Sequence, residues 1–109
     1  MPVVVLDDER MAFDRWKDMY VGVINRLIDT CGVDLVKPRL LQGRGRRGNS
    51  APWAKVPPDR YHKNVTTEQV LGLTVYTNLS AQECRVRAET LATELGATIS
   101  FPQVSEEGG

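Results

Sequence analysis

The sequence has few of the residues that build metal sites and catalytic centres. In 109 residues it contains one histidine, His62, and two cysteines, Cys31 and Cys84. A structural metal site needs more ligands and more closely spaced pairs, so we expect neither a metal nor another cofactor. Both cysteines fall on the apolar faces of expected helices, which predicts buried, reduced thiols instead of a disulfide.

Long apolar runs are also missing. The run Val3–Leu6 is too short for the core of a signal peptide and is followed at once by acidic residues. No stretch approaches the roughly 20 apolar residues of a membrane-spanning helix. We therefore expect a cytoplasmic protein with no membrane contact. The length predicts one small domain over residues 1–104, followed by a disordered acidic tail at 105–109.

Net charge is absent, but the charges are unevenly distributed. Residues 1–36 carry four basic and seven acidic side chains, and residues 64–109 carry two basic and six acidic ones. Residues 37–63 carry eight basic side chains and a single acid, Asp59. The balanced total therefore hides a basic middle between two acidic ends, and local charge of this kind indicates where a partner could bind.

Asp7–Gly32 has the strongest periodic pattern in the chain. Apolar side chains recur there at spacings of three and four residues, which predicts an amphipathic helix. We expect Asp7 and Asp8 to cap its first N–H groups and Gly32 to end it in a left-handed conformation. The apolar face consists of Phe13, Trp16, Tyr20, Val23, Ile24, Leu27, Ile28 and Cys31.

A second helix is expected over Leu79–Gly96. Ser80 and Glu83 match a capping box, Gly96 provides the stop, and the alanines of its apolar face favour close packing onto a sheet. Strands are expected where β-branched or alternating apolar residues occur, with prolines indicating sheet edges. These strands are Pro2–Leu6, Val33–Leu41, Leu73–Thr77 and Thr98–Val104, while Val65–Leu73 is either a capped turn of helix or part of a strand.

The order of these elements predicts an α+β fold. Two β-α-β units joined by a long connection match the ferredoxin-like (βαββαβ) two-layer sandwich, in which both helices cover one face of one antiparallel sheet. The alternative is a looser α+β domain in which the Phe13–Ile28 helix pairs with the same helix of a second copy. The side chains expected to be buried are Phe13, Trp16, Tyr20, Leu27, Leu91 and Leu95.

Val3–Glu9 (VVVLDDE) is similar to the opening of response-regulator receiver domains, whose acidic pair after the first strand helps to hold Mg²⁺. Such a domain also needs a phosphorylatable aspartate after its third strand. This chain reads GRGRRGNSAPW where that aspartate is due. We therefore assign Asp7 and Asp8 as helix caps and not as metal ligands.

The segment of residues 42–63 lacks apolar periodicity and is rich in glycine and proline, which predicts a flexible basic loop. Its arginines alternate with glycines, and guanidinium groups can fork onto phosphate oxygens. The R-G-R core resembles the arginine–glycine arms that enter the minor groove of A·T-rich DNA. Aromatic rings between the basic residues could stack on unpaired bases. The candidate nucleic-acid-binding residues are Arg39, Arg44, Arg46, Arg47, Trp53, Lys55, Arg60, Tyr61, His62 and Lys63.

We do not expect an enzyme. His62 is a lone histidine in a loop, no serine lies in a nucleophile elbow, and the glycines of residues 43–48 lack the lysine–hydroxyl ending of a phosphate loop. An RNA-recognition-motif arrangement is not favoured either, because Val3–Leu6 has no aromatic residue. We therefore predict a small interaction module that binds DNA or RNA through the basic loop. The alternative is a structural or adaptor protein, such as a viral or phage-type assembly or host-interaction protein, whose basic loop orders against a protein partner.

Overall fold

The computed structural model describes residues 2–42, 53–55, 67–70, 72–77 and 79–102. The predicted α+β class is confirmed, with three helices and short antiparallel strands among these residues. The strands are β1 (Val3–Leu6), β2 (Glu9–Ala12), β3 (Ala54–Lys55), β4 (Thr67–Val70), β5 (Leu73–Tyr76) and β6 (Ile99–Ser100). The helices are α1 (Trp16–Cys31), α2 (Val33–Gln42) and α3 (Ala81–Glu94).

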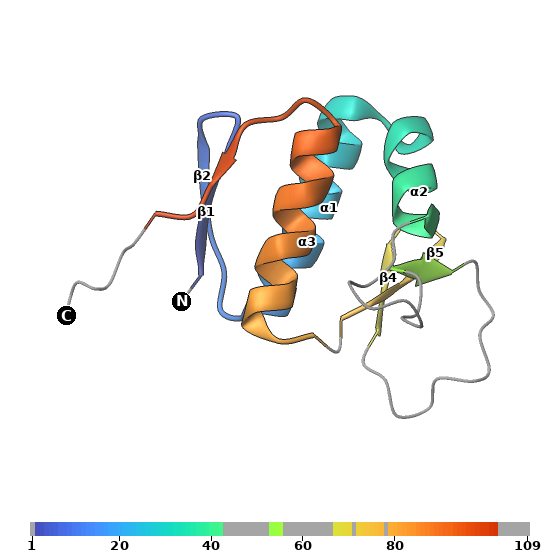
Figure 1. Cartoon of the computed structure of the whole chain (residues 1–109), viewed down its shortest axis with the longest axis horizontal. Coiled ribbons are helices and arrows are strands. Elements are labelled where there is room, and N and C mark those ends of the chain that lie inside the picture. The colour runs from blue at the N-terminus through green and yellow to red at the C-terminus, as the bar shows by residue number, and fades with distance from the viewer. Residues whose placement is uncertain (1, 43–52, 56–66, 71, 78, 103–109) are drawn as a thin grey trace.

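The described strands form two separate sheets instead of one. One sheet has the order β2-β1-β6 and the other has the order β3-β5-β4, and every neighbouring pair is antiparallel. Figure 1 shows the first sheet on one side of α1 and α3, and the second sheet on the other side together with α2. The ferredoxin-like topology is therefore not confirmed, and the two long helices do not cover a single sheet as we expected.

The centre of the molecule is the contact between α1 and α3, which lie side by side (Figure 1). Helix α1 contributes the larger apolar side chains, and α3 contributes smaller ones that let the two backbones approach. Each large aliphatic side chain removed from water in this way stabilises the fold by about 1.5–3 kcal/mol. The fully buried residues of the two helices are Met19, Tyr20, Val23, Ile24, Leu27, Cys84, Ala88, Leu91 and Ala92.

The burial predicted for the helices is therefore confirmed in part. Tyr20, Leu27 and Leu91 are fully buried. Phe13, Trp16 and Leu95 are partly buried and pack against the edge of the core.

Asp7 and Asp8 are not helix caps, and this prediction was wrong. They form the turn between β1 and β2, where both have positive φ angles of 49° and 71°. Positive φ at both central residues is what a tight hairpin turn requires, and aspartate tolerates it better than most residues. The Asp7 carboxylate also accepts a hydrogen bond of 2.9 Å from the Thr98 N–H, which ties this turn to the chain that leaves α3.

Val33–Gln42 is the helix α2, where we had predicted a strand at 33–41. Pro38 lies inside it and lacks the N–H that would pair with the carbonyl of the preceding turn, at a cost of about 3 kcal/mol. Val36 and Leu40, four residues apart, are both fully buried. Two such side chains contribute about 3–6 kcal/mol, which outweighs the proline.

Gly32 ends α1, as predicted, and also begins α2. Its N–H donates to the Ile28 carbonyl at 2.9 Å, and its own carbonyl accepts bonds from Leu35 and Val36 at 3.2 Å. Its φ of 94° is a conformation that other residues adopt only with strain. One glycine thus allows two helices to meet without an intervening loop.

The predicted N-cap of α3 is confirmed for Ser80, but the reciprocal half of the capping box is not formed by Glu83. The Ser80 hydroxyl accepts a hydrogen bond of 3.1 Å from the Glu83 N–H, as an N-capping serine should. The Glu83 carboxylate turns instead toward Arg87, one turn further along the helix. The strand expected at Leu73–Thr77 is present as β5 (Leu73–Tyr76). Of the strand expected at Thr98–Val104, Ile99–Ser100 form β6 in the described part of the chain, and within Val65–Leu73 the residues Thr67–Val70 form β4.

Gly22 and Phe13 provide a test of how tightly the N-terminal hairpin packs on α1. A Cβ atom at Gly22 would overlap the outer atoms of the Phe13 ring. We expect Gly22→Ala to lower the free energy of unfolding by about 1 kcal/mol, because overpacking exceeds the gain in helix propensity. In a Phe13→Ala background the same substitution should raise that free energy by about 1 kcal/mol. Urea unfolding of the wild-type protein, the two single variants and the double variant checks this. If Gly22→Ala changed the free energy of unfolding in the same direction with and without the Phe13 ring, the packing would be contradicted.

Candidate nucleic-acid interface and a buried arginine

Most of the predicted nucleic-acid-binding residues lie outside the described residues. They are Arg44, Arg46, Arg47, Arg60, Tyr61, His62 and Lys63. The flexibility expected for residues 42–63 and the acidic tail expected at 105–109 likewise concern residues that are mostly outside the described part. Of the other candidates, Lys55 contributes its backbone to β3, opposite Thr74 of β5. Arg39 and Trp53 are described in full, and they lie in different surroundings.

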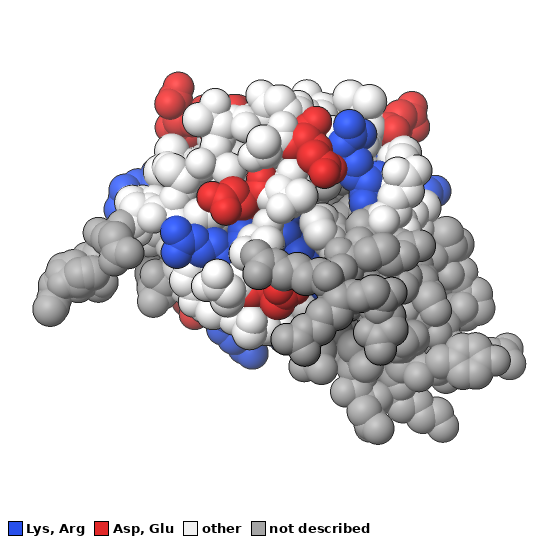
Figure 2. All heavy atoms as spheres, viewed as in Figure 1, with Lys and Arg blue, Asp and Glu red and all other residues white. Residues whose placement is uncertain are grey.

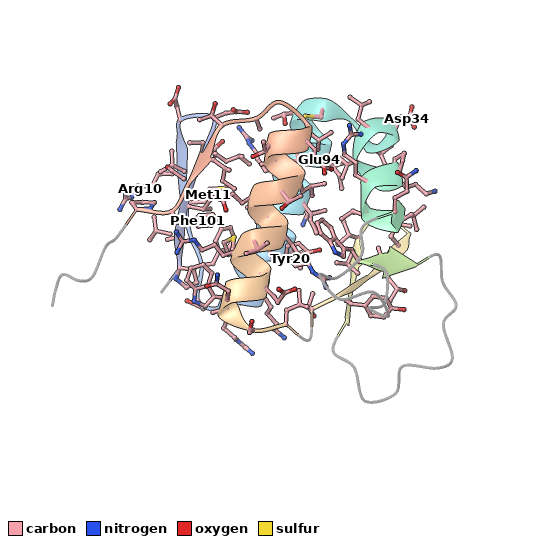
Figure 3. All side chains as sticks on the ribbon, viewed as in Figure 1. Arg10, Met11, Tyr20, Asp34, Glu94 and Phe101 are labelled. Atoms are coloured by element: carbon pink, nitrogen blue, oxygen red, sulfur yellow. The ribbon has the colours of Figure 1, made fainter. Side chains whose placement is uncertain are left out.

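Arg39 lies on the half-buried side of α2, near the point where the basic segment begins. Its Nε atom is 3.7 Å from a carboxylate oxygen of Glu94, at the end of α3. Figure 3 shows Glu94 on the side of α3 that faces α2. Because both side chains are more than one-third exposed, this ion pair contributes at most about 1 kcal/mol to stability. Arg39 can therefore exchange the Glu94 carboxylate for another anion.

Trp53 is buried, with 8% of its surface exposed. Its carbonyl accepts a hydrogen bond of 3.0 Å from the Tyr76 N–H, which fixes the residue beside the sheet β3-β5-β4. The guanidinium carbon of Arg87 lies 5.2 Å from the centre of its ring. In this structure the ring is therefore occupied by a cation and is not exposed for stacking on a nucleic-acid base.

Arg87 is the most unusual side chain of the described core. It belongs to the second turn of α3, and only 8% of it is exposed. Its Nε atom is 3.7 Å from the Glu83 carboxylate, which is beyond hydrogen-bonding distance. Among the described residues, neither Nε nor Nη1 has a hydrogen-bond partner. A buried guanidinium with one long ion pair is costly, because its charge has left water without receiving a full set of acceptors.

Tyr20 of α1 lies next to this arginine. It is fully buried, and its hydroxyl has no hydrogen-bond partner. Figure 3 shows Tyr20 on the side of α3 that faces β4 and β5. Burial raises the pKa of Tyr20 from 10.0 to about 12, and Arg87 offsets part of this effect through its positive charge and through its ability to donate a hydrogen bond to the ionised phenol. The phenol is therefore neutral at physiological pH and is available as a hydrogen-bond donor.

Two further polar groups complete these surroundings. Burial raises the pKa of the Cys84 thiol. The positive charge of Arg87 lowers this pKa and the negative charge of Glu83 raises it further, and the net increase keeps the free thiol protonated. Thr77 follows β5 directly, and its hydroxyl is buried without a hydrogen-bond partner. The other free cysteine, Cys31, is half-buried at the end of α1. The predicted burial is thus confirmed for Cys84 and met only in part by Cys31.

Sequence reasoning did not select Arg87. A helical projection of α3 places Cys84, Ala88 and Leu91 on the apolar face, and Arg87 lies at the border of that face. An arginine at such a border usually extends its charged end into water. The spacing of Glu83 and Arg87, four residues apart, was the available signal, and it is equally typical of an exposed helical pair.

Alkaline pH tests the burial of Tyr20. The folded-state pKa of about 12 lies above the ordinary value of 10.0, so the unfolded chain loses its proton first as the pH rises. The free energy of unfolding should then fall by about 2–3 kcal/mol as the pH rises from about 10 to about 12. Tyr20→Phe removes this loss and leaves the decline due to Cys84, which starts at lower pH because the ordinary pKa of a thiol lies below that of a phenol. Urea unfolding gives the free energy of unfolding of the wild-type protein and of Tyr20→Phe at each pH. Plotted against pH, the two free energies should diverge above about pH 10, and parallel plots would contradict the assignment.

Comparison with other proteins adds no further assignment to these sites. No group of three or more histidine, cysteine, aspartate or glutamate side chains among the described residues could hold a metal ion. None of the described helices combines the length and the apolar character needed to cross a membrane. Comparisons of the chain with models of protein families, with curated proteins and with solved structures found no match.

Proposed function

We propose that this protein is a small interaction module that binds nucleic acid through its basic segment, defined as residues 37–63. The observation that carries the proposal is the charge of this segment, which has eight basic side chains and one acidic one in a chain without net charge. Such a local excess of positive charge attracts a polyanion. When the two bind, the counterions condensed on the polyanion are released, and this release favours binding. No catalytic step is part of the proposal.

The positions of the described acidic residues support it. Glu9 pairs with Arg26, Asp18 with Arg15 and Glu83 with Arg87. Among the described residues, Glu94 is the acid that pairs with a member of the basic segment, Arg39. Figure 1 shows that the β1–β2 turn, with its acidic residues, lies on the opposite side of the helices from α2 and β5. The acidic residues at this turn, Asp7, Asp8 and Glu9, are therefore badly placed to neutralise the basic segment.

The surface of the described part gives further support. On the face shown in Figure 2, acidic and basic side chains of the described residues are interspersed and do not gather into a patch of one sign. A mixed surface of this kind offers little net attraction to a phosphate backbone. The basic segment is therefore the better candidate for contact with a polyanion, with Lys37 and Arg39 of α2 at its start.

Arg44, Arg46 and Arg47 are the residues that we assign to the phosphate contacts. Glycines stand between and beside them in the sequence. Glycine lets a backbone approach a ligand closely, and guanidinium groups bind phosphate oxygens through two parallel hydrogen bonds. Trp53 is left out of the contact set because its ring is buried against Arg87.

One observation favours the second candidate, a structural or adaptor protein that binds another protein. Val33 and Leu35 on α2 are 37% and 53% exposed, and they lie immediately before the basic segment. Exposed aliphatic side chains beside positive charge would suit an acidic protein surface with an apolar patch. Binding that depends on Leu35 and survives nuclease treatment would distinguish this function from nucleic-acid binding.

The salt dependence of binding tests the proposed function. Affinity for a labelled duplex should fall with salt at a log–log slope of about −0.9 for each phosphate neutralised. Replacing Arg44, Arg46 and Arg47 with alanine should flatten this slope by up to about three units. Fluorescence anisotropy over a series of salt concentrations measures both slopes.

A matched control is available from the described surface. Arg10, Arg15 and Arg85 are exposed and lie outside the basic segment. Their replacement with alanine changes the net charge by the same amount and should leave the slope unchanged. Equal effects of the two triple variants would show that only net charge matters, and absence of binding by the wild-type protein at low salt would refute the proposal.

A further inference from the structure

Four buried side chains on one side of the α1–α3 pair have polar atoms without a hydrogen-bond partner in the described part of the structure. They are Tyr20, Trp53, Thr77 and Arg87. Arg87 and the Trp53 indole can only donate hydrogen bonds, so they cannot satisfy each other. Buried polar groups in native proteins are nearly always paired, because an unpaired one keeps the full cost of having left water. These surroundings therefore contain a surplus of donors.

Arg87, Trp53 and Tyr20 are held close together by different parts of the fold, and Thr77 follows the residue that is hydrogen-bonded to Trp53. Arg87 lies over the Trp53 ring at 5.2 Å, and its charge acts on the Tyr20 hydroxyl. The Trp53 carbonyl accepts a hydrogen bond from the N–H of Tyr76, the residue directly before Thr77. The helix α1, the helix α3 and the sheet β3-β5-β4 each contribute to this group. We call these four residues the donor cluster.

We propose that the donor cluster binds an oxyanion of the phosphate class, with Arg87 as the charged ligand. A phosphate group offers three or more oxygen atoms, each able to accept more than one hydrogen bond. This number suits several donors on separate side chains better than the two oxygens of a carboxylate do. The surroundings of low polarity would strengthen each of these bonds relative to water.

Glu83 has a defined part in this proposal. It is the acidic side chain whose carboxylate pairs with Arg87 in the described structure, at 3.7 Å. Because it is 33% exposed, it can turn into solvent when an anion replaces it. Glu83 thus acts as an internal competitor that keeps Arg87 partly neutralised in the free protein. Removal of this carboxylate should strengthen anion binding, whereas a merely structural ion pair would give the opposite result.

This inference goes beyond the nucleic-acid binding proposed above and does not depend on it. Trp53 lies within the basic segment, but it is not one of the proposed nucleic-acid contacts, and the other three members of the donor cluster, Tyr20, Thr77 and Arg87, lie outside that segment. The phosphate can come from two sources, which are a free phosphate or mononucleotide and the terminal phosphate of a nucleic-acid strand. A burial of Arg87 beyond nine-tenths disfavours the internal phosphates of a duplex, which cannot enter the core.

Thermal unfolding in phosphate and in chloride, at matched ionic strength and neutral pH, tests the proposal with inorganic phosphate as the probe. The melting temperature of the wild-type protein should rise with phosphate in proportion to the logarithm of its concentration above saturation. Glu83→Gln should reach the same rise at a several-fold lower phosphate concentration. Gln keeps the backbone N–H that Ser80 caps, so the start of α3 is preserved.

Two arginine variants separate the donor cluster from general charge effects. Arg87→Lys keeps the charge but loses the forked donors, and it should abolish most of the phosphate-dependent rise. Arg85→Met is the matched control, because Arg85 is on the same helix, is exposed and also lies over an aromatic ring, that of Phe101, at 5.1 Å. Its phosphate response should equal that of the wild-type protein.

The outcomes are decisive even if Arg87→Lys fails to fold. A stronger response in Glu83→Gln supports the site. A weaker or absent response in this variant, or no response in the wild-type protein, overturns it. Tyr20→Phe gives a second readout, because loss of one hydroxyl donor should raise the phosphate concentration needed for half the effect. An unchanged midpoint in Tyr20→Phe would exclude Tyr20 from the site and contradict the proposed geometry.

The source of the phosphate is settled by direct binding measurements. Calorimetric titration with a mononucleotide is compared with titration by short single strands that carry or lack a 5′-phosphate. A preference for the phosphorylated strand that Arg87→Lys abolishes identifies the strand terminus as the ligand. Binding of the mononucleotide alone identifies a free ligand, and equal binding of both strands by wild-type protein and Arg87→Lys would contradict recognition through Arg87.

Discussion

Helices α1 and α3 contact each other through a face of large side chains on α1 and a face of smaller side chains on α3. The rest of the structure is arranged around that contact. The face of α1 carries Tyr20, Ile24 and Leu27, and the face of α3 carries Ala88 and Ala92. Small side chains on one helix leave room for large ones on the other, so the pair excludes water along its length. Each sheet has only three strands and rests on one side of this pair, where it gains the burial that a short sheet cannot obtain alone.

Local chemistry made parts of this fold predictable. The N-cap of α3 and the glycine that ends α1 depend on a few neighbouring residues, and both were identified from the sequence. The region before α1 was misassigned because Phe13 satisfies two patterns at once. Phe13 continues the helical spacing that leads to Trp16, and it also continues the strand alternation in which half-buried Met11 and Phe13 alternate with exposed Arg10 and Ala12. Pairing with β1 decides between these patterns, and it is a long-range property of the fold.

The interior arginine shows a second limit of the sequence. Both Trp53 and Arg87 belong to residue types that are often found at surfaces and interfaces. No pattern in the sequence indicates that these two side chains pack against each other. Their proximity requires β5 to position Trp53 beside α3, which follows only from the tertiary arrangement. The same arrangement joins the two functional proposals physically. The sheet that places Trp53 over Arg87 also contains β3, which lies within the basic segment, so the core and the predicted contact region share one element.

The central claim is that the side of the molecule formed by α2 and β3 faces a polyanion and that the N-terminal hairpin does not. Hydrogen exchange followed by mass spectrometry, with and without a short oligonucleotide, measures this most directly. The account predicts slower exchange in peptides from residues 37–63, and unchanged exchange in peptides from β1 and β2 on the opposite side of the helices. Protection confined to the hairpin, or no protection at salt concentrations low enough for binding, would contradict it.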